Sequence, residues 1–201
     1  MYEVEIKVPA ELEAVRERLR RVDAERVGAR RQRDVYYDAP HREFAETDEA
    51  LRVRHETVRP DGVETAEDDE GPDGDGEKPD GDETTRLTYK GPLLDEGSKT
   101  RSEHEAGVDD PEAMAEILDG LGFEPAATVV KRREYWAFRE FTVTLDDVDG
   151  VGEFVEIERE IPETETIDAT REAAVESLSR LGLDADKQVR TSYLGLLLAD
   201  S

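Results

Sequence analysis

The chain has 201 residues, which is long enough for one domain with a sizeable core. Its 53 acidic and 27 basic residues give a formal net charge of −26, which argues against a general nucleic-acid binder, because such proteins present a basic surface. It contains no cysteine, so disulfides and thiolate metal sites are excluded.

The first predicted element is a strand at the start of the chain. Glu3, Glu5 and Lys7 alternate with apolar residues, so they share one face of this strand. Like charges that are neighbours on one face repel each other. A metal cation between the carboxylates would remove that cost, and hard cations such as Mg²⁺ prefer carboxylate oxygens. The alternative is a solvated edge strand that binds no metal.

A helix is expected to open at Pro9, because proline suits the first turn of a helix. Its apolar stripe would consist of Leu12, Val15, Leu19 and Val22. A short strand is expected at 51–54, where two arginines, Arg52 and Arg54, share one face and the apolar residues share the other.

The segment from Asp61 to Glu83 holds twelve acidic residues, one lysine, five glycines and two prolines, with almost nothing apolar. Such a segment cannot bury enough surface to offset its ordering entropy. We therefore expect a disordered loop inserted between two strands. It is either an inert insertion or a regulatory or calcium-binding loop, although Asp73–Gly76 lacks the full spacing of a calcium loop.

The charged alternation continues through the segments that follow. One face of each carries mostly charged and polar residues: Arg86, Thr88 and Lys90; Arg101, Glu103 and Glu105; Lys131, Arg133 and Tyr135; Thr142, Thr144 and Asp146; and Glu156 and Glu158. Period-two alternation is typical of an antiparallel sheet with one polar face.

Three further segments are expected to be helical. The first opens at Pro111, with Met114, Ile117, Leu118 and Leu121 facing the core; the second covers about 168–181, with Ala174, Leu178 and Leu181 inward; the third is a short apolar docking helix at 193–198.

Two architectures fit these strands. In an open sheet the charged faces would lie in bulk water and carry little meaning. In a closed barrel they would line a charged tunnel. Converging lysines and arginines would be costly inside a barrel unless an anion occupied the space. A polyphosphate is the matching anion, and the acidic cluster would hold the metal that accompanies it.

Several blocks of the sequence follow one another in the order of a known family. They are E-x-E-x-K at 3–7, a tyrosine pair followed by aspartate within 32–38, L-R-x-R at 51–54, T-x-K-G-P at 88–92, R-x-E-x-E at 101–105, K-x-R at 131–133, L-D at 145–146, G-x-F-x-E-I-E at 152–158, preceded by Val151 in place of the usual leucine, and S-Y at 192–193. The chain resembles the CYTH superfamily of triphosphate tunnel metalloenzymes, and the resemblance covers everything except the acidic insertion.

The resemblance implies an α+β fold, namely an eight-stranded antiparallel β-barrel with flanking helices. Residues 1–201 would form a single CYTH domain with the acidic insertion at 61–83. For Tyr36 and Tyr37 we favour packing in the barrel wall over contact with substrate.

The resemblance also implies a set of site residues. Mg²⁺ or Mn²⁺ would be bound by Glu3, Glu5, Asp146, Glu156 and Glu158. The phosphates of the substrate would be bound by Lys7, Arg52, Arg54, Lys90, Arg101, Lys131 and Arg133. Glu3, Glu5, Lys7, Lys90 and Lys131 would be catalytic. Glu103 and Glu105 would either complete this charge lattice or pair structurally with tunnel arginines. With no cysteine and no H-x-x-x-H spacing, a zinc site is not expected.

The implied activity is that of a class IV adenylyl cyclase, which converts ATP to 3′,5′-cyclic AMP and pyrophosphate. The tyrosine pair, the T-x-K-G-P block and the spacing of the acidic strand favour this branch. The alternatives are a thiamine or inorganic triphosphatase that uses the same tunnel, and a non-catalytic module that binds polyphosphate or nucleotides.

The expected partner is a nucleoside triphosphate or another triphosphate. Neither nucleic acid nor a membrane is expected as a partner, and a homodimer is compatible with the resemblance.

The sequence also gives an expectation about where the protein works. No apolar run has the length of a membrane span, and the N-terminus lacks the apolar core of a signal peptide, so we expect a soluble, cytoplasmic protein. Excess acid with little lysine is typical of proteins from salt-loving organisms, in which screening limits charge repulsion.

Overall fold

The computed structural model describes all of the chain except residues 1, 43, 60–82, 95–100, 164–165 and 200–201. The strands are β1 (Tyr2–Pro9), β2 (Glu25–Asp38), β3 (Ala50–Arg59), β4 (Glu83–Leu93), β5 (Arg101–Val108), β6 (Glu124–Phe138), β7 (Phe141–Val148) and β8 (Gly152–Ile161). The helices are α1 (Leu12–Arg21), α2 (Phe44–Thr47), α3 (Pro111–Gly120), α4 (Ile167–Arg180) and α5 (Tyr193–Ala199), with a 3₁₀ turn, η2, at Ala185–Lys187.

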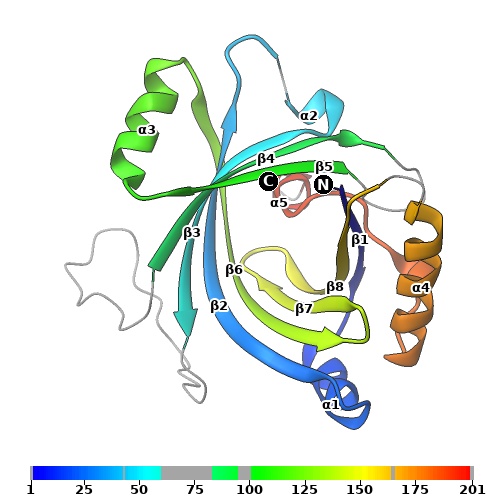
Figure 1. Cartoon of the computed structure of the whole chain (residues 1–201). Coiled ribbons are helices and arrows are strands. Elements are labelled where there is room, and N and C mark those ends of the chain that lie inside the picture. Colours follow the sequence, from blue (N-terminus) through cyan, green and yellow to red (C-terminus); the bar gives the residue numbers. More distant parts are fainter. Residues whose placement is uncertain (1, 43, 60–82, 95–100, 164–165, 200–201) are drawn as a thin grey trace.

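The eight strands form a closed antiparallel barrel in the order β1-β5-β4-β3-β2-β6-β7-β8 (Figure 1). The expected fold is therefore confirmed. β1 pairs with β8 along its whole length, whereas it pairs with β5 only at two positions, Tyr2 opposite Ser102 and Glu3 opposite Arg101. The barrel is thus closed by a short seam between β1 and β5.

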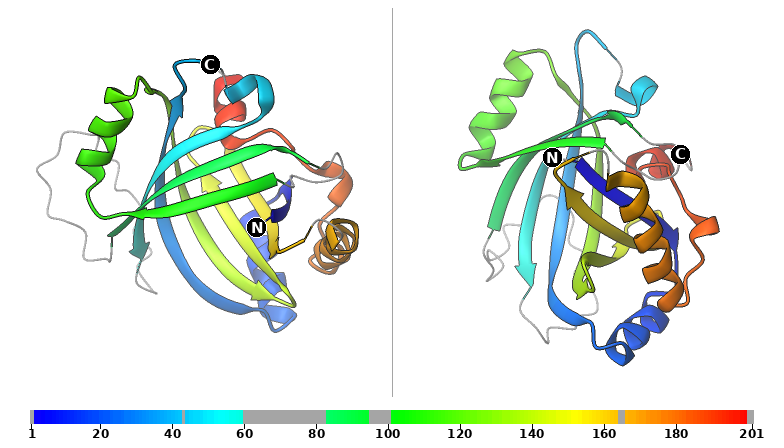
Figure 2. Two further views of the ribbon diagram at one scale, coloured as in Figure 1. Left: turned by 45° about the horizontal axis from the view of Figure 1, so that its top comes forward. Right: turned by 45° about the vertical axis from the view of Figure 1, so that its right-hand side comes forward.

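The main hydrophobic core lies outside the barrel, between its wall and two helices. Figure 2 shows α4 along the side of the barrel, where it contacts β1 and β8, and α1 at the lower end, where it contacts β7 and β8. The outward side chains of these strands meet the apolar faces of the helices, and this core includes Ile6, Val8, Leu12, Val15, Leu19, Val143, Leu145, Val155, Ile157, Ala174, Leu178 and Leu181. Alternation therefore leaves the inner face of each strand free for polar side chains.

The helix expected at Pro9 begins three residues later. Pro9 is the last residue of β1, and α1 begins at Leu12, whose N–H donates to a carboxylate oxygen of Glu153 at 3.1 Å. An acid from β8 thus satisfies one of the free N–H groups at the start of the helix. Val22 follows the last residue of the helix and is 36% exposed, so it does not extend the buried stripe.

The helix at Pro111 is confirmed, but half of its expected core face is wrong. Asp110 accepts a hydrogen bond from the N–H of Ala113 and caps α3. Met114 and Leu118 pack against the outer side of the barrel, whereas Ile117 is 55% and Leu121 62% exposed. Met114 and Leu118 are four residues apart and therefore lie on one face of the helix.

The acidic insertion lies outside the described residues, apart from its last residue. Glu83 is the first residue of β4. The segment joins β3 and β4, which pair directly from Ala50 opposite Lys90 to Thr57 opposite Glu83. Within the described part of the chain, no helix has the length and apolar composition needed to span a membrane.

Candidate active site

The charged strand faces converge inside the barrel, and on these faces Arg86 and Glu105 stay partly exposed. They line a cavity of about 860 Å³. The predicted site residues that line it are Glu3, Glu5, Lys7, Arg52, Arg54, Lys90, Arg101, Lys131, Arg133, Glu156 and Glu158. Asp146 is the one predicted site residue that is not among the residues of this lining. The tunnel architecture was thus the correct choice between the two that the sequence allowed.

Three carboxylates form one cluster on the wall made by β1 and β8. Glu5 lies directly opposite Glu158, and Glu156 follows one inward position along β8. Each can offer an oxygen such that all three oxygens lie within 4.8 Å of one another. Burial, together with the nearby carboxylates of Glu3 and Glu156, raises the pKa of Glu158 to about 8.

This cluster fits a hard divalent cation. Glu5 Oε1 is buried and has no hydrogen-bond partner among the described residues. An all-oxygen set of carboxylates is the donor chemistry that Mg²⁺ and Mn²⁺ prefer. A cation here would remove the repulsion between the acids and would give Glu5 Oε1 a partner.

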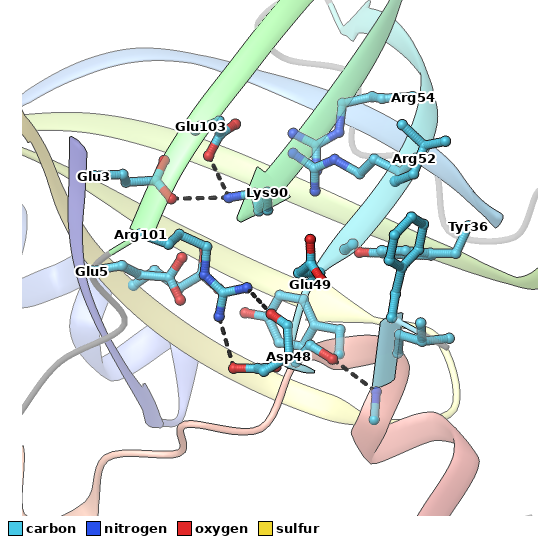
Figure 3. A pocket seen from close by; sticks show the side chains of 18 of the residues that line it. Glu3, Glu5, Tyr36, Asp48, Glu49, Arg52, Arg54, Lys90, Arg101 and Glu103 are labelled. Atoms are coloured by element: carbon cyan, nitrogen blue, oxygen red, sulfur yellow. Dashed lines mark hydrogen bonds and ion pairs between the residues drawn. The ribbon is translucent and has the colours of Figure 1, made fainter. Parts of the chain in front are cut away.

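Glu3 is held by a lysine at the seam of the barrel. The amino group of Lys90 on β4 lies 2.9 Å from Glu3 Oε1 on β1 and 2.7 Å from Glu103 Oε2 on β5 (Figure 3). Burial alone would lower the pKa of Lys90, but these two carboxylates outweigh it and raise the pKa above its usual range. Lys90 therefore stays charged and links the two strands that close the barrel.

Arg54 and Arg52 are held from behind by a buried acid that the sequence analysis did not select. Asp34 on β2 is 1% exposed, and it accepts hydrogen bonds from Arg54 Nε at 2.6 Å and Arg54 Nη2 at 2.7 Å. Arg52 Nη1 donates to it at 3.3 Å. Burial alone would raise the pKa of Asp34, but Arg54 and Arg52 hold it below its usual range. The alternation of Gln32, Asp34 and Tyr36 on β2 was the signal that could have revealed it.

Arg133 is held in the same way by Asp146. Arg133 Nε donates to Asp146 Oδ1 at 2.6 Å, and its Nη2 contacts both Asp146 and Glu156. Tyr193 donates its hydroxyl proton to Asp146 Oδ2 at 2.8 Å. Asp146 is fully buried behind Arg133, outside the cluster of Glu5, Glu156 and Glu158. Its role as a metal ligand stays a prediction.

Two buried lysines complete the cationic part of the tunnel. Lys7 donates to the carbonyl oxygen of Thr191 at 2.7 Å, and its amino group lies 4.0 Å from the ring centroid of Tyr193. The amino group of Lys131 lies 5.0 Å from the centroid of the same ring and 3.9 Å from Oδ2 of Asp146. Burial and the charge of Arg133 lower the pKa of Lys131 to about 7.

One end of the tunnel is bordered by α2 and α5. Arg101 is only 5% exposed and donates to the carbonyl oxygen and the carboxylate of Asp48, at 2.5 and 2.9 Å. The predicted phosphate ligand Arg101 therefore anchors the turn between α2 and β3 (Figure 3). Apolar and aromatic side chains line this end: Tyr36, Tyr37, Phe44, Leu51, Leu194 and Leu198.

Tyr36 and Tyr37 belong to two different hydrophobic clusters. Tyr36 packs with Val129 and Phe154, and Tyr37 with Val53 and Leu118. The register of β2 against β6 shifts between the two tyrosines, so both can reach the cavity as well. The expectation that they pack in the wall is confirmed, and both also border the tunnel.

The sequence analysis also did not select Arg30, Glu49 and Glu56, which line the tunnel, or Gln32, which is fully buried beside Glu56. Gln32 Nε2 donates to Glu56 Oε2 at 2.5 Å and to the Tyr135 hydroxyl at 2.8 Å, and Arg30 pairs with the same glutamate. Glu49 accepts from Thr47 and Tyr89 at the α2 end. Arg86 pairs with Glu105 at 2.5 Å, which bears out the structural-pairing alternative for Glu105.

Comparison with known proteins agrees with this architecture. The model of the CYTH domain matches residues 1–193. A Methanocaldococcus jannaschii protein named "Putative adenylate cyclase MJ0240" is 34% identical over 197 residues, which cover 98% of each chain. The Aeromonas hydrophila protein named "Adenylate cyclase CyaB" is 24% identical over 162 residues, which cover 81% of this chain and 70% of the relative.

A solved structure has the same fold along its whole length. The PH1819 protein from Pyrococcus horikoshii OT3 superimposes with a TM-score of 0.83 at 36% identity, and the match covers 99% of both chains. A family match that spans nearly the whole sequence, a relative of equal length and a tunnel with acids facing cations all agree. The chain belongs to the CYTH domain family.

Proposed function

We propose that this chain is an enzyme of the class IV adenylyl cyclase type, which converts ATP to 3′,5′-cyclic AMP and pyrophosphate with a divalent metal. The observation that carries the proposal is the composition of the tunnel, in which a cluster of three carboxylates and a set of buried cations line one cavity. The names of the Methanocaldococcus and Aeromonas relatives support the cyclase assignment.

The buried cations would bind the triphosphate. Lys7, Lys131, Arg52, Arg54 and Arg133 are each at most 8% exposed. In such surroundings their attraction for an anion is screened less than at the surface. Their mutual repulsion would be relieved when phosphate oxygens take the space between them.

Glu5, Glu156 and Glu158 would hold Mg²⁺ or Mn²⁺. Bound there, the ion supplies positive charge to phosphate oxygens and to the leaving pyrophosphate. Glu3 lies next to the cluster and forms an ion pair with Lys90. Asp146 already accepts hydrogen bonds from Arg133 and Tyr193, which leaves it fewer lone pairs with which to join the ligand set.

The reaction needs in-line positioning and charge stabilisation more than covalent catalysis. The 3′-oxygen of the ribose forms a bond to the α-phosphorus, and the bond from that phosphorus to the bridging oxygen breaks. Pyrophosphate leaves, and the hydroxyl proton must be accepted by a base. Among the tunnel cations Lys131, with its pKa of about 7, can exchange a proton near neutral pH.

The end of the tunnel next to α2 and α5 supports an organic triphosphate as the substrate. Aromatic and apolar side chains gather there, including Tyr36, Phe44 and Leu198. Such a surface suits a nucleoside, because aromatic side chains can stack on a base. An inorganic triphosphate has no organic group that could contact this surface.

A triphosphatase is the second candidate. The charged part of the tunnel recognises phosphates and metal, and these groups are the same for hydrolysis of thiamine triphosphate or tripolyphosphate. A non-catalytic polyphosphate binder is less well supported, because the clustered carboxylates would repel a polyanion unless a metal lies between them.

One experiment separates these functions. The protein is incubated with ATP, thiamine triphosphate or tripolyphosphate in Mg²⁺ or Mn²⁺, and cyclic AMP, pyrophosphate and phosphate are measured separately. Equal amounts of cyclic AMP and pyrophosphate from ATP support the cyclase. Phosphate release without cyclic AMP supports the triphosphatase. Calorimetric binding without any product supports the binding module. The variant Glu5→Gln is the control for contaminating activity.

A further inference from the structure

A buried carboxylate stands behind the phosphate-binding arginines, where an anion site would be expected to avoid negative charge. Asp34 on β2 is 1% exposed, and its two oxygens accept hydrogen bonds from both Arg54 and Arg52. Its charge opposes that of a triphosphate in the same tunnel. Asp34 therefore does not help the site by attracting the phosphates, and its contribution must come from its effect on the two arginines.

The contact with Arg54 fixes the plane of the guanidinium group. Asp34 and Arg54 are direct cross-strand partners, and Nε and Nη2 each donate to a different carboxylate oxygen, at 2.6 and 2.7 Å. Paired contacts of this kind add geometric specificity as well as energy. A guanidinium group has five N–H donors, of which Asp34 takes two, so three on Arg54 are left for a ligand.

Arg52 is held by the same carboxylate through one contact. Its Nη1 donates to Asp34 Oδ2 at 3.3 Å, while its Nε is buried and has no acceptor among the described residues. Figure 3 shows the two guanidinium groups side by side, pointing toward Lys90. Asp34 thus holds two positive charges next to each other before any phosphate binds.

A second arginine–aspartate pair, on β6 and β7, repeats this arrangement. Arg133 on β6 and Asp146 on β7 are also direct cross-strand partners, with Nε to Oδ1 at 2.6 Å. The tunnel wall therefore carries two arginines, each locked by an aspartate behind it. Burying the charge of Asp34 is costly and is offset by this pairing.

We propose that Asp34 is a positioning residue for triphosphate binding: its carboxylate holds Arg54 and Arg52 in the orientation that presents their free N–H groups to the phosphates. The inference rests on the proposed function of the tunnel. It assigns to Asp34 a role that acts through the arginines and involves no contact with the substrate.

The test is tripolyphosphate affinity, measured by calorimetry without metal so that turnover plays no part. Asp34→Asn removes a negative charge, so attraction alone predicts tighter binding. Positioning predicts weaker binding, by about tenfold or more, because the amide has only one oxygen and its NH₂ group faces an arginine donor. Asp147→Asn is the matched control: Asp147 is exposed on the outer face of β7, where it pairs with Arg132 at 3.2 Å, and its removal should leave affinity unchanged.

A second background asks whether Asp34 acts through the two arginines that it holds. The double variant Arg52→Lys/Arg54→Lys keeps both charges but loses both planar guanidinium groups. In that background Asp34→Asn should weaken tripolyphosphate binding by less than about threefold, because the orientation that Asp34 controls is already lost. Equal losses in both backgrounds would mean that Asp34 acts elsewhere and would overturn the inference.

The remaining outcomes are also decisive. If the unchanged protein binds tripolyphosphate and Asp34→Asn binds it equally or more tightly, the inference is wrong and the proposed function stands. If the unchanged protein binds tripolyphosphate only with Mg²⁺, the same comparison is made with Mg²⁺ present. If it binds tripolyphosphate neither without metal nor with Mg²⁺, both the proposed function and the inference are wrong. If Asp34→Asn does not fold, Asp34→Glu replaces it: the charge is kept and displaced by one methylene, so weaker binding supports positioning and unchanged binding overturns it.

Discussion

Glu5 and Glu158 lie directly opposite each other on β1 and β8, and both line the tunnel. Without a cation the two carboxylates repel, which is part of the reason that the pKa of Glu158 is raised to about 8, after burial and the effect of Glu3.

Replacement of either acid should abolish turnover and leave the fold intact. Glu5→Gln or Glu158→Gln removes a carboxylate ligand, and an amide is a weaker ligand for a hard cation. We expect turnover with Mg²⁺ to fall more than about 100-fold, while thermal stability without metal stays the same or rises, because repulsion is relieved. The measurement pairs an activity assay with a melting curve. Glu17→Gln, on the exposed side of α1, is the control, and near-normal turnover in Glu5→Gln would remove the metalloenzyme assignment.

Deletion of the acidic insertion should preserve activity. β3 and β4 pair directly up to Thr57 and Glu83, so a short Gly-Ser turn in place of residues 61–82 leaves the ladder intact. Loop length changes the closure entropy only slowly, and we expect the melting temperature to shift by less than about 4 °C. Melting curves and steady-state rates measure the outcome. A folded deletion variant without turnover would show that the insertion has a functional role.

Tripolyphosphate should stabilise the protein against heat. At about 100 times the dissociation constant, a ligand that binds only the folded state adds about 2.7 kcal/mol, or roughly 5–10 °C for a chain of this size. Arg133→Ala should reduce the shift, because Arg133 lines the tunnel, and Arg171→Ala on α4 should not.

The stabilisation should also survive high salt better than binding at the surface would, because buried charges are screened less. Differential scanning fluorimetry in low and high salt measures it. If Arg171→Ala loses the shift as fully as Arg133→Ala does, binding occurs on the outer surface and not in the tunnel.

Affinity for tripolyphosphate should fall as the pH rises through about 7. Lys131 has its pKa lowered to about 7 by burial and by Arg133, so in the free protein it loses its charge over pH 6–8. The anion binds the charged form, so binding is tightest below this window and weakens above it, with proton uptake on binding. Lys131→Arg stays charged throughout and should lose this part of the pH dependence. Calorimetry on both proteins from pH 6 to pH 9 tests this, since the titration of the ligand itself is common to both; superimposable profiles would contradict the assignment.

The sequence alone determined the strand pattern, the inner and outer faces and most of the tunnel residues. Side chains at i and i+2 on a strand point the same way in any sheet, so Glu3, Glu5 and Lys7, or Arg52 and Arg54, could be grouped before any partner strand was known. The blocks shared with the CYTH family then placed these groups in one barrel.

Only the tertiary structure decided which charges meet. The closure of β1 on β5, and the position of β2 between β3 and β6, bring together residues far apart in the chain. Asp34 faces Arg54 because of that register, and Asp146 faces Arg133 rather than the acids of β8. Ile117 on α3 is exposed, whereas Met114 and Leu118 of the same helix pack against the barrel. Local periodicity fixes the direction of a side chain relative to its own strand, whereas its neighbour depends on long-range pairing that no local pattern contains.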